Sequence, residues 1–263
     1  MNIVVDVGNT NIYMGVFQEE ELLATFRTAT DVMKSRDEYE IVFLSFLAKN
    51  HIERETISDI MIASVVPMMN GILKGVIRNV FGFEPLFLAQ GVKTGLAIRI
   101  DNPSETGSDL IADCVGAIAK YGNGLLIVDL GTASKILVVD NRGDFVGGVI
   151  MAGMQISMEA LAKNTANLNE IDLSGTRKVI GKNTIECINS GLINGNKHMI
   201  NGLCEDIEKE LGYHCKRILT GGYANLLKDM NNYIYDDTLI LDGLNIILNK
   251  NKKYEEMRKN NEK

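Results

Sequence analysis

Two short polar turns in this sequence carry residue types that can bind an anion. They read DVGNTN at 6–11 and DLGTAS at 129–134, and each lies between two apolar runs. Glycine allows a tight reversal of the chain, and the backbone N–H groups of such a turn can converge on an anion. Threonine and asparagine side chains add neutral donors, while Asp6 and Asp129 could each hold a cation or a metal-bound water. Two such turns facing one cleft would hold a polyphosphate from both sides.

Each turn could also be an ordinary hairpin connection, because Asn-Gly and Asp-Gly types are common in hairpins. For a single turn we would prefer that interpretation. Two matching copies, each after a buried-type strand, favour the phosphate site instead. The sequence has neither a G-x-x-x-x-G-K-[ST] loop nor a G-x-G-x-x-G pattern after its first apolar run. The two common nucleotide-binding loops are therefore not the source of phosphate binding.

Two further features could take part in chemistry. The glycines of TGG at 220–222 would let the backbone approach a flat ring or a ribose, although Gly-Gly also ends strands for structural reasons. Asp109 follows Gly107 and Ser108 at a predicted helix start. Its carboxylate could orient an attacking hydroxyl and take its proton, or it could cap the helix. The residues alone leave both alternatives open.

Composition excludes several classes of function. The chain has 263 residues, 46% of them hydrophobic, and a net charge of −7, which argues against a nucleic-acid partner. No apolar run approaches the ~18 residues that span a bilayer, and the apolar start is short and contains Asp6, so we expect a cytoplasmic protein without a membrane partner. The four cysteines are widely spaced and are expected to be small buried residues rather than disulfides or zinc ligands.

The apolar patterning predicts the elements that must position these residues. In the first part of the chain the predicted strands are 2–7, 12–17, 21–30, 59–67 and 85–89, and the predicted helices are 36–50, 69–81 and 108–121. In the second part the predicted strands are the two arms of 124–140 and then 144–151, and residues 217–224 are predicted as a strand followed by a glycine turn. The predicted helices are 153–166, 183–211 and 224–230. The order predicts mixed sheets that open with an antiparallel hairpin and continue through parallel crossovers.

The two halves begin alike, which predicts a duplicated fold with domains at 1–120 and 121–263. The charged tail at 249–263 is expected to be frayed. The apolar stripe of the helix at 183–211 could pack against a second copy of the chain or within its own domain.

In its ordered motifs the chain resembles the acetate and sugar kinase, heat-shock chaperone and actin superfamily, and within it the type III pantothenate kinases. The supporting stretches are DVGNTN at 6–11, SVVP at 64–67, DNPSETGSD at 101–109, IVDLGTA at 127–133, GGVIMAG at 147–153, IGKNT at 180–184 and TGGYA at 220–224. The resemblance implies an α/β fold of duplicated ribonuclease H-like (actin-like ATPase) domains, with mixed sheets and flanking helices around a central cleft.

The resemblance also implies ATP-dependent phosphorylation of pantothenate, the first step towards coenzyme A, by a homodimer that uses Mg²⁺ and a potassium or ammonium ion. Asp109 would be the catalytic base, and Asp129 would lie at the monovalent cation. The matching nucleotide contacts are Asp6, Val7, Gly8, Asn9, Thr10, Asn11, Ile12, Tyr13, Thr132, Gly221 and Gly222. The matching pantothenate contacts are Ile100, Gly107, Ser108, Asp109, Leu110 and Thr184.

The chain departs from the family pattern where the substrate should be held. Leu110 replaces an arginine and offers no donor, and Ile100 or Arg99 replaces a tyrosine. The remaining departures are Ser134-Lys135 for threonines, Ala152 for proline and Asn167-Leu168-Asn169 for Thr-x-x-Leu-Pro. Lys135 could meet a phosphate, but we expect a solvated lysine. Three alternatives follow: a pantothenate kinase with a rearranged pocket, a kinase for another small hydroxylated metabolite, or a nucleotide-binding regulator.

Overall fold

The computed structural model describes residues 1–164, 173 and 178–261, and it divides into two compact units. Unit 1 contains Met1–Leu96, Asp101–Ala119 and the segment from Thr238 through the last helix, and unit 2 contains Ala97–Ile100 and Lys120–Asp237. The chain passes from unit 1 to unit 2 after Ala119 and returns at Thr238, so that the last helix belongs to unit 1. The expected domains at 1–120 and 121–263 stay a prediction.

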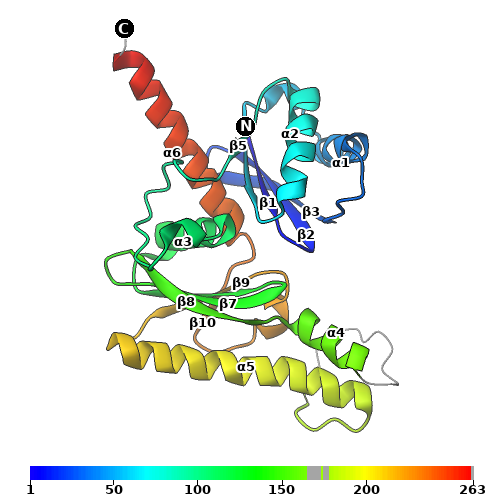
Figure 1. Cartoon of the computed structure of the whole chain (residues 1–263), viewed down its shortest axis with the longest axis vertical. Coiled ribbons are helices and arrows are strands. Elements are labelled where there is room, and N and C mark those ends of the chain that lie inside the picture. Colours follow the sequence, from blue (N-terminus) through cyan, green and yellow to red (C-terminus); the bar gives the residue numbers. More distant parts are fainter. Residues whose placement is uncertain (165–172, 174–177, 262–263) are drawn as a thin grey trace. The chain divides into compact units, whose positions relative to one another are not determined.

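Unit 1 is built on a five-stranded sheet in the order β3-β2-β1-β4-β5 (Figure 1). β1 is antiparallel to β2 and parallel to β4. The strands are β1 (Asn2–Val7), β2 (Asn11–Gln18), β3 (Glu21–Ala29), β4 (Asp59–Ser64) and β5 (Leu86–Phe87). The helices are α1 (Arg36–Lys49), α2 (Pro67–Phe81), α3 (Ser108–Tyr121) and α6 (Leu239–Asn261), with short 3₁₀ turns at Arg54–Thr56 and Pro103–Glu105.

Helices cover both faces of this sheet, which explains why the middle of β1, residues 3–5, is apolar. Ile3 and Val5 belong to a core shared with α1 and α2, whereas Val4 belongs to a core shared with α3 and α6. Alternate residues of a strand face opposite sides, so a strand buried on both sides needs apolar residues throughout.

The helices α3 and α6 approach each other through glycines. A Cβ on Gly116 of α3 would lie 3.3 Å from the Cα of Gly243 on α6. A Cβ on Gly243 would collide with the carbonyl of Ala112. Only glycine at both positions permits this backbone contact, and it fixes the position of α3 against α6.

Unit 2 repeats the arrangement with the order β10-β9-β6-β7-β8. Read from β8, this is the order of unit 1: a hairpin of antiparallel strands, then a parallel crossover. The elements are β6 (Leu125–Leu130), β7 (Ala133–Val139), β8 (Phe145–Ala152), α4 (Met154–Asn164), α5 (Thr184–Leu211), β9 (Lys216–Thr220), a 3₁₀ turn (Ala224–Leu227) and β10 (Tyr233–Tyr235). The expected duplication and the mixed sheets are therefore confirmed.

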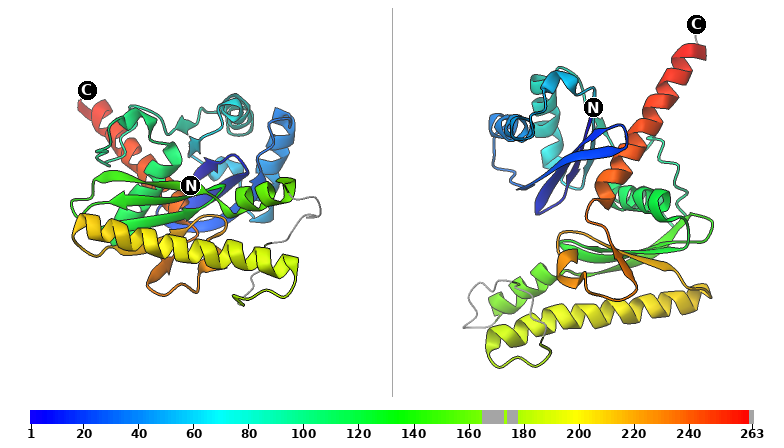
Figure 2. Two further views of the ribbon diagram at one scale, coloured as in Figure 1. Left: turned by 60° about the horizontal axis from the view of Figure 1, so that its bottom comes forward. Right: turned by 180° about the vertical axis from the view of Figure 1, so that it is seen from behind.

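The helix α5 lies along one face of the unit 2 sheet (Figure 2). Its residues Ile193 and Ile200 are buried in the core with Val128 of β6. The side chain of Asn183 accepts a hydrogen bond from the N–H of Glu186 at the start of the helix. The apolar stripe thus packs within unit 2, although Ile185 at its beginning is exposed.

The C-terminal segment differs most from its prediction. Within the expected frayed tail, residues 249–261 form the second half of α6, whose first half buries Leu241, Leu244 and Ile247 in a core of unit 1. The apolar half anchors the helix, and its charged half continues the same backbone hydrogen bonding. Within the predicted helix at 224–230, only Ala224–Leu227 form a short 3₁₀ turn, and β10 was not predicted.

The four cysteines are free thiols. Cys114 and Cys204 are buried as expected, Cys215 is half-buried, and Cys187 on α5 is exposed, so the expectation is wrong for Cys187. Among the described residues, no helix is both long enough and apolar enough to cross a membrane.

Candidate functional site

The turn between β1 and β2 accepts hydrogen bonds from the residue that follows β3. The N–H of Gly8 donates to the carbonyl of Asn11 at 3.0 Å. Thr30, just after β3, donates its hydroxyl to the carbonyl of Gly8 at 2.7 Å and its N–H to the carbonyl of Thr10 at 2.9 Å. The carbonyls of the turn are thereby bound on one side, while Asn9 is exposed. The role of Thr30 was not anticipated from the sequence.

The predicted catalytic segment, residues 107–110, is hydrogen-bonded to the strand next to this turn. Asp6 and Val7 of β1 lie next to Ala63 and Ser64 of the parallel strand β4. The N–H of Ser64 donates to the side-chain oxygen of Ser108, the first residue of α3, at 3.1 Å. Unit 1 therefore brings the first turn of α3 to the strand that borders the Asp6 turn.

Asp109 lies inside the first turn of α3, and the capping position is taken by Gly107. The N–H of Ile111 donates to the carbonyl of Gly107 at 3.2 Å, which is the first hydrogen bond of the helix. The Asp109 carboxylate folds back over Gly107, where any Cβ would collide with its Oδ1 atom. A side chain at residue 107 would thus displace the carboxylate. The base and the capping alternatives for Asp109 both stay predictions.

The predicted pantothenate contacts fall into two groups. Gly107 to Leu110 form one continuous group at the start of α3 in unit 1, and Leu110 is half-buried. Ile100 and Thr184 belong to unit 2. Ile100 follows a bridge between Ile98 and Phe145, and Thr184 is an exposed residue at the start of α5. The departures at 167–169 lie outside the described residues.

The turn between β6 and β7 is built by close backbone contacts. The N–H of Gly131 donates to the carbonyl of Ala133 at 3.2 Å. A Cβ on Gly153, just before α4, would collide with the carbonyl of Thr132 and lie 2.7 Å from that of Gly131. Gly153 is therefore required for α4 to begin against this turn.

The predicted adenosine motif is bound to the same turn. Gly221 has a φ of +97°, and a Cβ there would meet the Asp129 carboxylate and the Leu130 backbone. The N–H of Tyr223 donates to the carbonyl of Leu130 at 2.9 Å, and its hydroxyl donates to Gln155 of α4. Burial raises the pKa of Tyr223, which keeps the hydroxyl protonated as a donor. Unit 2 thus brings together the Asp129 turn, Gly221 and α4.

Asp129 is paired with Lys135. The two residues face each other across β6 and β7, and the Lys135 Nζ lies 2.7 Å from the Asp129 Oδ2. The Lys135 and Asp129 side chains are only 14% and 13% exposed, respectively. The expectation of a solvated lysine is therefore wrong. Counting the register outward from Thr132 could have shown that Lys135 lies opposite Asp129.

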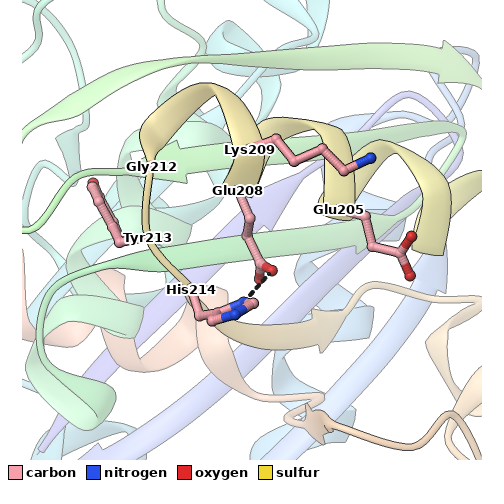
Figure 3. Close-up of a pocket in the computed structure, with 6 residues that line it drawn as sticks. All are labelled: Glu205, Glu208, Lys209, Gly212, Tyr213 and His214. Carbon is pink, nitrogen blue, oxygen red and sulfur yellow. Dashed lines mark hydrogen bonds and ion pairs between the residues drawn. The ribbon is translucent and has the colours of Figure 1, made fainter.

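A second charged cluster lies at the end of α5, where a cavity of about 420 Å³ is lined by Glu205, Glu208, Lys209, Gly212, Tyr213 and His214 (Figure 3). Arg217 of β9 contacts the Glu208 carboxylate at 3.0 and 3.1 Å, and the Nδ1 atom of His214 lies 2.9 Å from it. Burial raises the pKa of Glu208, but these hydrogen bonds outweigh burial and lower it to about 2. None of the predicted site residues lies here, and the cluster joins α5 to β9.

Comparisons with known proteins agree with the motifs. The family model for type III pantothenate kinase matches residues 2–206. A type III pantothenate kinase of Koribacter versatilis is 39% identical, covering 95% of this chain and 96% of that protein. One of Myxococcus xanthus is 36% identical, covering 95% and 99%, respectively.

Solved structures show the same fold at low identity. The activator of the 2-hydroxyisocaproyl-CoA dehydratase from Clostridium difficile, with bound ADPNP, is 13% identical with a TM-score of 0.59 and covers 97% of both chains. Component A of the Acidaminococcus fermentans (R)-2-hydroxyglutaryl-CoA dehydratase is 12% identical with a TM-score of 0.54, covering 93% of this chain and 94% of that one. With the family model and the relatives above, the conclusion is that this chain belongs to the type III pantothenate kinase family.

Proposed function

We propose that this protein transfers the terminal phosphoryl group of ATP to pantothenate, giving 4'-phosphopantothenate and ADP, the first step of coenzyme A synthesis. Family membership over residues 2–206 carries the proposal. The arrangement of each unit supports it, because each has a glycine turn at the end of a central strand. The first turn of α3, with its carboxylate, is attached beside one of them.

In this proposal the chain mainly positions the reactants. Phosphoryl transfer needs alignment and charge neutralisation rather than covalent chemistry by the protein. The N–H groups and side chains of the Gly8 and Gly131 turns would bind phosphate oxygens, and the backbone at Gly221 and Gly222 would lie against the nucleoside. Asp109 would accept the proton of the attacking hydroxyl as its oxygen bonds to phosphorus, while the bond to ADP breaks.

We also propose Mg²⁺ as a cofactor that arrives with ATP and neutralises phosphate charge. The donors of the first turn fit it, because Asp6 supplies a carboxylate at the end of β1 and hard cations prefer such oxygen ligands and water. The described residues contain no cluster of three or more His, Cys, Asp or Glu side chains that could hold a metal without a substrate. Removing Mg²⁺ with a chelator should abolish turnover, and adding it back should restore the rate. Unchanged ADP release in the chelator would contradict this role.

A potassium or ammonium ion at Asp129, the other ion implied by the resemblance, does not fit the residues present. The Oδ2 atom of Asp129 is paired with Lys135, and its Oδ1 atom faces the backbone at Gly221. No step of the proposed reaction is assigned to that ion.

The test of the proposed function is ADP release in the presence of ATP, Mg²⁺ and pantothenate, with the product identified by its mass. We expect turnover that requires pantothenate and a product heavier by one phosphoryl group. ADP release at the same rate without pantothenate would contradict the proposal.

Leu110 favours a second candidate, a kinase for another small hydroxylated metabolite. The side chain beside Asp109 is apolar and half-buried, so it cannot bind a polar group of the substrate. Losing one polar contact typically weakens recognition by ~10–100-fold. A panel of small alcohols in the same assay separates the candidates. Turnover of another alcohol with pantothenate inert supports the second candidate, and nucleotide binding without any turnover indicates a regulator.

We propose a homodimer as the assembled form. Exposed apolar side chains on unit 2, including Ile150, Ile156, Leu161, Val179, Ile180 and Ile185, support a contact with a second copy. Light scattering after size exclusion should give twice the mass of the 29.0 kDa chain, and a monomeric mass would contradict the proposal.

A further inference from the structure

The pairing of Asp129 with Lys135 places a positive charge at the second predicted phosphate turn, residues 129–134. We propose that the Lys135 ammonium is a cation built into the chain, so that nucleotide binding and turnover need no potassium or ammonium ion. This inference rests on the proposed nucleotide site, but not on the identity of the substrate that receives the phosphoryl group.

One oxygen of the Asp129 carboxylate is ion-paired within unit 2, and the other lies close to the backbone of Gly221. The Lys135 Nζ lies 2.7 Å from Oδ2. Oδ1 faces Gly221, where even one added carbon atom would collide with it. A bound potassium ion would have to displace the ammonium or lie beside it, and like charges at such short range repel strongly where water is scarce.

The Lys135 ammonium can take the place of a dissolved cation, because it carries the same charge and is held beside Asp129. It gives the turn the same net charge as Asp129 with one monovalent cation. The β6–β7 register holds it opposite Asp129, with Leu130 facing Ser134 on one side and Val128 facing Ile136 on the other. Because it is attached to the chain, its effective concentration at Asp129 does not depend on the salt. Its side chain is 14% exposed, so dissolved ions compete with it poorly.

The test measures binding of a non-hydrolysable ATP analogue with Mg²⁺ by calorimetry, and turnover, at constant ionic strength. The salts are those of potassium, ammonium, sodium and tetramethylammonium, the last being too large for a site of this kind. For the unaltered protein we expect the same Kd and rate within about twofold in all four salts. A tenfold gain in affinity or rate in potassium over tetramethylammonium would overturn the inference.

Lys135→Gln removes the built-in cation. We expect its nucleotide Kd to be at least tenfold weaker in tetramethylammonium and to recover partly in potassium or ammonium, while Lys135→Arg keeps a salt-independent Kd. Lys120→Gln is the matched control, since it breaks a second Lys–Asp pair of unit 2, with Asp236, and should show no salt-specific nucleotide binding. Wild-type affinity of Lys135→Gln in every salt would contradict the proposal.

A double variant separates a folding defect from a loss of function. If Lys135→Gln does not fold, Asp129→Asn combined with Lys135→Gln leaves no unpaired charge, and we expect weak nucleotide binding in all salts. Wild-type binding by the double variant would argue against Lys135.

The proposed substrate and the role of Lys135 can fail separately. If pantothenate is not phosphorylated but the nucleotide Kd is independent of the salt, the proposed substrate is wrong and the inference on Lys135 holds. If pantothenate is phosphorylated only in potassium or ammonium, the proposed substrate holds and the inference on Lys135 is wrong.

Discussion

Asp109→Asn should separate chemistry from folding, because asparagine keeps the shape of the side chain and a hydrogen-bond acceptor while it removes the charge. Asparagine is also a good acceptor for backbone N–H groups at a helix start, so the variant should still fold. We expect kcat to fall by ~10²–10⁴-fold with little change in the KM for ATP. A coupled ADP-release assay measures both, and circular dichroism checks the fold.

The matched control for this variant is Asp101→Asn. Asp101 is an exposed acid in the segment that leads to α3. Its change should leave kcat within about twofold of the unaltered protein, as exposed substitutions usually do. Equal losses in the two variants would show that the segment is sensitive to charge in general and that Asp109 has no special role.

Single residues of the site were predictable from the sequence where the backbone conformation requires a particular residue type. Gly8 and Gly131 indicate turns, and Asp109 follows a glycine at a helix start. The prediction for Lys135 was wrong because a side chain on a hairpin can face either solvent or the neighbouring strand. Only the register, which puts Asp129 opposite it, decides between them.

At the scale of elements, the approach of α4 to the β6–β7 turn depends on Gly153. A Cβ at this position collides with the Thr132 carbonyl, so Gly153→Ala must displace either the turn or the helix. We expect nucleotide affinity to fall by at least tenfold, and stability to fall by ~1–3 kcal/mol, as overpacking typically costs. Calorimetry with an ATP analogue and urea unfolding provide the two measurements.

Gly195→Ala is the control on α5. Nothing lies within 4 Å of a Cβ at Gly195, which is exposed in a helix. Alanine should stabilise the protein there by ~0.5–1 kcal/mol and leave nucleotide affinity unchanged. If both variants bind nucleotide normally, the turn does not depend on Gly153.

The junction of α5 and β9 predicts a pH dependence of stability. Because hydrogen bonds from Arg217 and His214 lower the pKa of Glu208 from 4.5 to about 2, the folded protein favours the ionised carboxylate. The stability that it contributes is present above about pH 4.5 and is lost as the pH falls towards 2. Glu208→Gln should lower the free energy of unfolding at pH 7 by ~1–2 kcal/mol, less than the full shift implies, because solvent near His214 screens the charges.

Urea unfolding at pH 7 and at pH 3.5 measures this difference. The gap between Glu208→Gln and the unaltered protein should be smaller at the lower pH. Asp206→Asn is the control, because Asp206 pairs with Lys209 on the surface with both side chains more than 70% exposed, and it should change little at either pH. A gap that widens on acidification would contradict the role of Glu208.

Helices and strands were predictable where apolar residues form a clear helical or strand pattern, as in β1, β6 and α5. The first half of α6 was missed because its apolar residues match the core of a distant part of the chain. Leu241 belongs to the same core as Val4, more than two hundred residues away, and no local pattern reveals such a distant core. β10, with three residues, is too short for its period to be recognised.

At the scale of the whole molecule, the chain leaves unit 1 after Ala119 and returns at Thr238. A fragment of residues 1–119 lacks α6, and with it Leu241, Leu244 and Ile247 of its second core. We expect this fragment to lose cooperative unfolding and near-UV circular dichroism. Joining residues 238–263 to it through a short Gly/Ser linker should restore both. Cooperative unfolding of residues 1–119 alone would show that α6 is dispensable.

The glycine contact between α3 and α6 has a mechanical consequence. Side chains can change rotamer and let two helices slide, but at Gly116 and Gly243 backbone meets backbone. The helix α3, which bears Asp109, should therefore move together with α6 as one rigid body. A spin label on the exposed end of α6 would then report displacements of the helix that bears Asp109 during turnover.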